Sequence, residues 1–126
     1  TGATLKYKWG DYAYAPMKNN ETLANLFLNN INLLGNPMVL CDKNEKFGST
    51  DMGNVSQITP AIHPIVSITS LPLNFHTPQF ARTAASEEAF QESLNAAKAM
   101  AMTATDLLAN SSTLDKVRAE FTSNTR

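Results

Sequence analysis

The chain begins with hydrophobic and polar residues in strict alternation. Over residues 3–9 one side of the pattern is polar or basic, and the other side is apolar and consists of Leu5, Tyr7 and Trp9. A period of two is typical of a strand with one covered face. A second strand is predicted at 65–69, a β-branched run between two prolines. The short apolar run at 38–41 fits either a strand or a buried connector.

Three later segments have the period of an amphipathic helix. Hydrophobic residues step by three and four over about 20–34, and a Gly-Asn-Pro sequence ends this segment. A helix is also predicted over about 86–109, because a serine followed by two glutamates precedes a stripe expected to be buried: Phe90, Leu94, Ala97, Ala101, Ala104 and Leu108. Its alanines allow close approach to a sheet or another helix. A capping box at Ser112 predicts a last short helix.

These strands and helices together predict an α/β fold, and the composition adds limits to it. The 126 residues suit one domain, and the net charge of −1 argues against a nucleic-acid partner. No stretch approaches the roughly 18–20 apolar residues of a membrane span. A single cysteine and two histidines exclude a disulfide framework and the usual structural zinc clusters. Cys41 is expected to be a small buried hydrophobe. With no targeting segment visible, we expect a cytoplasmic protein.

Residues 47–56 are the first candidate for chemistry. Two glycines there surround hydroxyl, carboxylate and amide side chains, and consecutive backbone N–H groups in such a loop can hold a carboxylate or phosphate. The loop lacks the Gly-Lys-Ser/Thr ending of a phosphate-binding loop. An ordinary surface turn is the alternative interpretation.

The second candidate is His76, in an aromatic and proline-containing loop ahead of the long helix. From its surroundings alone, this histidine is either a metal ligand or catalytic residue, or a structural or exposed side chain. His63 precedes a predicted strand and is expected to be structural. No Gly-x-Ser-x-Gly sequence supports a serine nucleophile.

Four short sequence motifs occur in an order and spacing that resemble those of one enzyme family. They are GSTDMGNVS at 48–56, AIHPIVSI at 61–68, FHTPQF at 75–80 and NAAKAMAMTATDLL at 95–108. The combination resembles the C-terminal part of the zinc-dependent amidohydrolases that include aminoacylases, carboxypeptidase G and aminobenzoyl-glutamate hydrolase. Within this family the chain is most similar to the aminobenzoyl-glutamate hydrolase and dipeptidase branch. The resemblance extends over about residues 1–122.

The resemblance implies a segment of a two-domain enzyme that hydrolyses dipeptides or N-acyl amino acids. Residues 1–16 would be the last strand and exit of a lid domain, and 17–126 the C-terminal portion of the catalytic domain. His76 matches the last metal-binding histidine of the family, and the substrate-binding loop matches Ser49, Thr50, Asp51, Gly53 and Asn54. The loop at 48–54 and His76 are therefore expected to lie near one another at one end of the sheet. The other zinc ligands and the catalytic glutamate would lie outside this chain, which therefore carries no catalytic residue and is expected to be inactive alone.

One alternative function and one possible assembly accompany this interpretation. The chain could be a non-catalytic interaction or antigenic module that retains the amidohydrolase scaffold. Because an unpaired strand edge at 3–9 invites pairing with a second chain, a homodimer is also expected to be possible.

Overall fold

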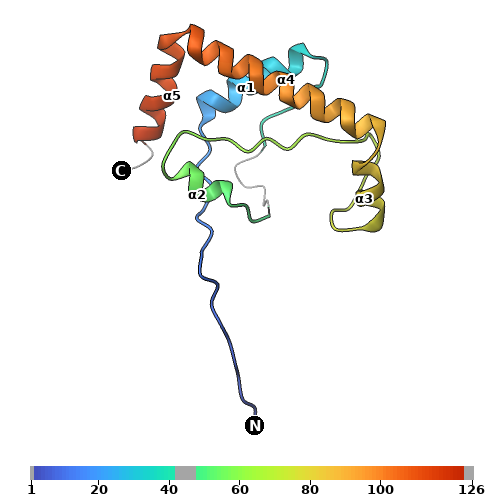
Figure 1. Ribbon diagram of the computed structural model, residues 1–126. Helices are drawn as coiled ribbons and strands as arrows, with labels where there is room; N and C mark the ends of the chain where they lie inside the picture. The colour runs from blue at the N-terminus through green and yellow to red at the C-terminus, as the bar shows by residue number, and fades with distance from the viewer. Residues whose placement is uncertain (1, 42–47, 124–126) are drawn as a thin grey trace.

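The computed structural model describes residues 2–41 and 48–123, and these residues contain five helices (Figure 1). The helices are α1 (Glu21–Leu33), α2 (Met52–Ser56), α3 (Pro78–Ala84), α4 (Glu87–Ala109) and α5 (Ser111–Ser123). None of the helices within these described ranges is long and apolar enough to cross a membrane.

Local capping explains where the longer helices begin. The Asn20 side chain accepts a hydrogen bond from the Leu23 N–H at 2.9 Å, and the Ser86 hydroxyl accepts one from the Ala89 N–H at 3.2 Å. The helices predicted at 20–34 and 86–109 are therefore confirmed to within a residue or two. The last helix is also confirmed, but the side chain that accepts from its first turn belongs to Asn110 and not to Ser112.

The predicted α/β fold is wrong, because the described residues contain no sheet. Their β-pairing is limited to one isolated parallel bridge between Asn19 and Ala61. Residues 3–9 are exposed and run away from the helices toward the N-terminus (Figure 1). Neither 38–41 nor 65–69 forms a strand. Alternation indicates which side chains share a face, but a strand also needs a neighbouring backbone about 4.8 Å away, and the described chain provides none for these segments.

The buried core is small and lies between α1 and α4. Phe27 and Ile31 from α1 contact Ala99 from α4, and all three are buried. Leu34, Met38 and Ile62 pack partly buried around this cluster. Ala99 has a small side chain, so the two helices approach closely at the point where Ile31 is completely buried.

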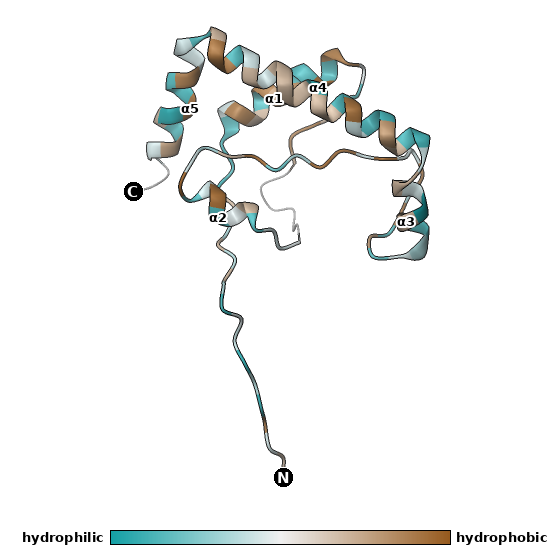
Figure 2. Ribbon diagram, in the orientation of Figure 1, coloured by the Kyte–Doolittle hydropathy of each residue, from teal (hydrophilic) through white to brown (hydrophobic). Residues whose placement is uncertain are grey.

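The face of α4 that is buried differs from the predicted one. Every residue of the predicted stripe (Phe90, Leu94, Ala97, Ala101, Ala104 and Leu108) is exposed, whereas Ala89, Ala99 and Thr103 are buried. Hydrophobic residues occur along much of α4 and along the connection between α2 and α3 (Figure 2). An alanine-rich helix therefore offers more than one face that could pack, and apolar spacing alone did not identify the one that does.

Polar contacts explain which face of α4 meets α1. The buried Asn30 side chain donates to the Thr103 hydroxyl at 3.1 Å and to the Asp106 carboxylate at 2.8 Å. After α1, the side-chain oxygen of Asn36 accepts from the Asn95 side-chain amide at 3.0 Å. These partners lie on one side of α4, and a buried asparagine left without them would be costly. The exposed stripe offers no comparable partners.

The N-terminus of α1 is tied to α5 by two polar side chains. The buried Asn20 amide donates to the Val117 carbonyl oxygen at 2.9 Å. The Glu120 carboxylate accepts from the Glu21 N–H at 2.5 Å, from the Thr22 N–H at 2.9 Å and from the Thr22 hydroxyl at 2.6 Å. A carboxylate at this position satisfies free N–H groups and complements the helix dipole.

This carboxylate is expected to make the stability depend on pH. Burial acts to raise the pKa of Glu120, but the hydrogen bonds from Thr22 and Glu21 outweigh it and lower the pKa below its usual value. Because the pKa is lower in the folded chain, the stabilisation is fully present above the unfolded value of about 4.3. It is lost as the pH falls through the folded value.

Urea unfolding of the wild type and of Glu120→Gln between pH 3 and pH 7 checks this expectation. At pH 7 the glutamine variant should be less stable by about 1 kcal/mol, since it keeps an acceptor but loses the charge. The difference should narrow as the pH falls below 4. A difference that stays constant over this range would contradict the proposed role of the Glu120 charge.

Candidate functional site

The loop predicted to bind substrate leads directly into the short helix α2. Ser49 and Asp51 are exposed and Thr50 is half-buried. The Thr50 hydroxyl accepts from the Met52 N–H at 3.3 Å. Asp51 occupies the position before the helix without a capping hydrogen bond, and its carboxylate has no hydrogen-bond partner among the described residues. The carbonyl oxygens of Thr50 and Asp51 accept from the N–H groups of Gly53 and Asn54, so the side chains of Ser49 and Asp51 are the groups of this loop that lack a partner among the described residues.

The other two predicted loop residues, Gly53 and Asn54, contact the backbone of the N-terminal segment. Gly53 is buried against Ala15, and a Cβ atom at this position would lie 1.9 Å from the Ala15 carbonyl oxygen. The Asn54 side chain accepts from the Ala15 N–H at 2.7 Å and donates to the Ala13 carbonyl oxygen at 3.1 Å. Both residues hold the chain together at this point, so the surface left for a ligand is formed by residues 49–51.

Sequence reasoning missed two further residues in the same turn. The Ser56 hydroxyl is completely buried, accepts from the Lys18 N–H at 2.9 Å and donates to the Gly53 carbonyl oxygen at 2.6 Å. The Gln57 amide donates to the Pro16 carbonyl oxygen at 2.7 Å. Ser56 and Lys18 are 38 residues apart along the chain, and Gln57 and Pro16 are 41 residues apart. No local pattern in one sequence pairs them.

His76 is exposed on the tight loop that precedes α3. Its backbone φ of 61° makes it the one residue other than glycine with a positive φ in the described part of the chain. The Thr77 hydroxyl braces the loop by donating to the Asn74 carbonyl oxygen at 3.0 Å and accepting from the Phe80 N–H at 3.1 Å. The rings of Phe75 and Phe80 lie 5.1 Å apart. A braced loop with an uncommon backbone conformation therefore presents the imidazole to solvent.

The structure does not bring the loop at 49–54 and His76 together. Figure 1 shows α2 and α3 well separated, joined by a long extended connection. Of the described helices, α3 contacts α4, whereas α2 contacts none of the others and is held by residues 13–18. The expectation that both candidates lie at one end of a sheet is not met, because the sheet that would have aligned them is absent from the described residues.

The described residues do not form a metal site among themselves. They contain no group of three His, Cys, Asp or Glu side chains that could hold an ion. Cys41 is exposed, so the prediction that it is buried was wrong. His63 is exposed as well. A zinc site takes three or four protein ligands, so a zinc ion bound at His76 would need its other ligands from outside the described residues.

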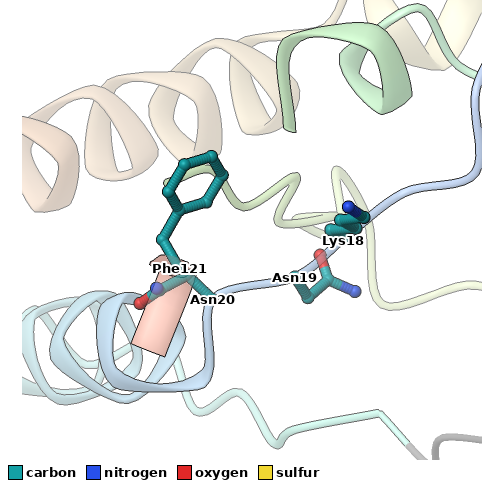
Figure 3. Close-up of a pocket in the computed structure, with 4 residues that line it drawn as sticks. All are labelled: Lys18, Asn19, Asn20 and Phe121. Atoms are coloured by element: carbon teal, nitrogen blue, oxygen red, sulfur yellow. The ribbon is translucent and has the colours of Figure 1, made fainter. Parts of the chain in front are cut away.

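Two hollows on the described surface are also poor candidates for a ligand. One lies between residues 18–20 and the Phe121 ring of α5 (Figure 3), with a volume of about 10 Å³, which is enough for at most one water molecule. The other is lined only by Leu5, Tyr7, Lys8 and Trp9, all from one exposed segment. No second element encloses it.

Comparison with known proteins indicates a peptidase relationship. No protein-family profile matches the chain. The chain is 38% identical over 123 residues to Xaa-Arg dipeptidase from Homo sapiens, and equally to the Mus musculus protein. The aligned region covers 96% of this chain but 28% of each dipeptidase. The chain therefore spans little more than a quarter of the length of these curated relatives.

Proposed function

We propose that the chain is part of a longer zinc-dependent amide hydrolase that acts on dipeptides or N-acyl amino acids. The similarity to the Xaa-Arg dipeptidases, which runs through almost the whole chain, is the observation that carries this proposal. The chain would contribute to such an enzyme one metal ligand and part of a substrate-binding surface. The remaining catalytic groups would come from the rest of the longer protein.

His76 is the proposed metal ligand. Its imidazole is exposed, and it is carried on a loop whose backbone is held by hydrogen bonds of the Thr77 hydroxyl. In such an enzyme zinc lowers the pKa of a bound water to about 7 and makes hydroxide available near neutral pH. This chain's part is to position one imidazole nitrogen.

The proposed substrate surface is the loop of Ser49, Thr50, Asp51, Gly53 and Asn54. The hydroxyl and backbone N–H groups of residues 49–51 are the groups available to hold the carboxylate or the peptide end of a substrate. Gly53 and Asn54 support this surface from below, because both contact the N-terminal segment. The loop and His76 would act on the same substrate only if the rest of the longer protein brings them to one site.

The large exposed surface supports the idea that more polypeptide packs against this chain. The chain exposes 9787 Å², whereas a compact protein of 13.7 kDa exposes about 6,600 Å². Leu5, Tyr7 and Trp9 are each more than 70% exposed. We propose that residues 1–16 are the exit from a second domain and that residues 17–126 belong to the catalytic domain. The same exposed surface also favours the second candidate function, a non-catalytic interaction module, and is compatible with a homodimer.

The decisive experiment uses the longer protein that contains this chain. We expect purified protein to hold zinc and to hydrolyse Xaa-Arg dipeptides, β-alanyl dipeptides or N-acyl amino acids, with chelation removing the activity. The 126-residue chain alone is the control, and we expect neither turnover nor sub-micromolar zinc binding from it. A longer protein that contains no zinc and hydrolyses none of these substrates would overturn the enzyme proposal in favour of the interaction module.

A further inference from the structure

Side chains in the turn at residues 53–57 form hydrogen bonds with the backbone of residues 13–18. Asn54, Ser56 and Gln57 direct their side chains to four backbone groups there, at Ala13, Ala15, Pro16 and Lys18. Backbone groups of an isolated extended segment would otherwise be left to water. Residues 13–18 therefore have an extended conformation that side chains of a distant turn stabilise in place of a second strand.

The geometry at Asn54 imitates the pairing between parallel strands. In a parallel ladder, one residue donates to the carbonyl that precedes the opposite residue and accepts from the N–H that follows it. The Asn54 amide makes the same pair of bonds around Tyr14, donating to Ala13 and accepting from Ala15. The side-chain amide thus takes the place of a neighbouring peptide group.

Gly53 makes this close approach possible. With a Cβ atom only 1.9 Å from the Ala15 carbonyl oxygen, any other residue at position 53 would force the segment away from α2. Two features therefore support this contact. Position 53 has room only for glycine, and three polar side chains form hydrogen bonds with the backbone of residues 13–18.

The hydrogen bonds that hold residues 13–18 do not continue on the N-terminal side of Ala13. Residues 3–12 form no hydrogen bond with any other described part of the chain, and a bend occurs at Asp11 and Tyr12. Gly10 adds backbone freedom immediately before this bend. The chain thus passes from an unattached segment to a firmly attached one within three residues.

We propose that residues 53–57 form a clamp that fixes residues 13–18, so that the exposed segment 3–9 pivots about Gly10–Tyr12. Because the clamp belongs to α2, displacement of residues 13–18 also displaces the loop at 49–51 that precedes this helix. The clamp is a positioning device that links the N-terminal segment to this loop. It does not depend on the proposed enzymatic function.

Amide hydrogen exchange measured by NMR on the 126-residue chain tests the clamp residue by residue. In Asn54→Ala, exchange of the Ala15 N–H should accelerate about tenfold or more, while the Lys18 N–H changes little. In Ser56→Ala the Lys18 N–H should be the one that accelerates. Asn25→Ala is the matched control, because this exposed asparagine bonds only to Glu21 in its own helix, and it should leave both amides unchanged.

Several results would overturn the proposal. Unchanged Ala15 exchange in Asn54→Ala would remove the clamp's central contact. A general loss of helix in that variant would show that Asn54 supports the whole fold and not one segment. In the wild type, ¹⁵N relaxation should show backbone order rising between residues 12 and 13. Uniform order from residue 3 to residue 18 would exclude the pivot.

Discussion

The substitution His76→Ala in the longer protein is expected to reduce dipeptide hydrolysis by more than about a hundredfold, and to lower the zinc content. Replacing a group that merely orients a metal ligand already costs about 10- to 100-fold, and loss of the ligand itself should cost more. The fold should persist, because His76 is exposed and lies outside the buried cluster of Phe27, Ile31 and Ala99. Activity and bound zinc are both measured on the purified variants.

Two further variants make this result interpretable. His76 has a positive φ, which alanine adopts less readily than asparagine does. His76→Asn therefore preserves the loop while removing the imidazole, and it should lose activity to the same extent. His63→Ala removes the chain's other histidine, which is also exposed, and should remain active. Full activity and full zinc content in both His76 variants would refute the ligand assignment.

The substitution Ile31→Ala is expected to lower the free energy of unfolding by about 2–3 kcal/mol. Ile31 is completely buried, and it belongs to a core cluster of only three fully packed residues. We expect the lower part of the usual range because a thin core allows some collapse around the cavity. For a chain with so small a core this is a large share of its stability.

Leu33→Ala is the matched control for this measurement. Leu33 lies in the same helix and is 77% exposed, so its truncation should change the stability by less than about 0.5 kcal/mol. Both variants are compared by urea unfolding of the 126-residue chain. Equal effects at the two positions would show that α1 does not pack on α4 through Ile31.

The three longer helices, α1, α4 and α5, and their ends were predictable because the forces that set them are local, whereas the short helices α2 and α3 were not predicted. Asn20 and Ser86 each cap a helix within three residues of their own position, and Gly35 follows the end of α1. The loop before α3 is also set by local contacts, since the Thr77 hydroxyl bonds to residues 74 and 80 and the Thr77 carbonyl oxygen accepts from the Ala81 N–H. The sequence alone placed His76 in a loop ahead of the long helix, but α3, which directly follows this loop, and the positive φ of His76 became known only from the structure.

The remaining features depend on contacts between distant residues, which periodicity does not contain. Residues 3–9 have a strand's alternation, but a strand exists only beside a partner backbone, and none of the described residues lies there. The buried face of α4 carries Thr103 and Asp106, which bond to Asn30, 73 and 76 residues away, and it is not the predicted stripe of apolar residues. Likewise, Gly53 and Asn54 were recognised as a special loop from the sequence. Only the tertiary structure showed that they contact the backbone of residues 13–15, because that contact joins segments about forty residues apart.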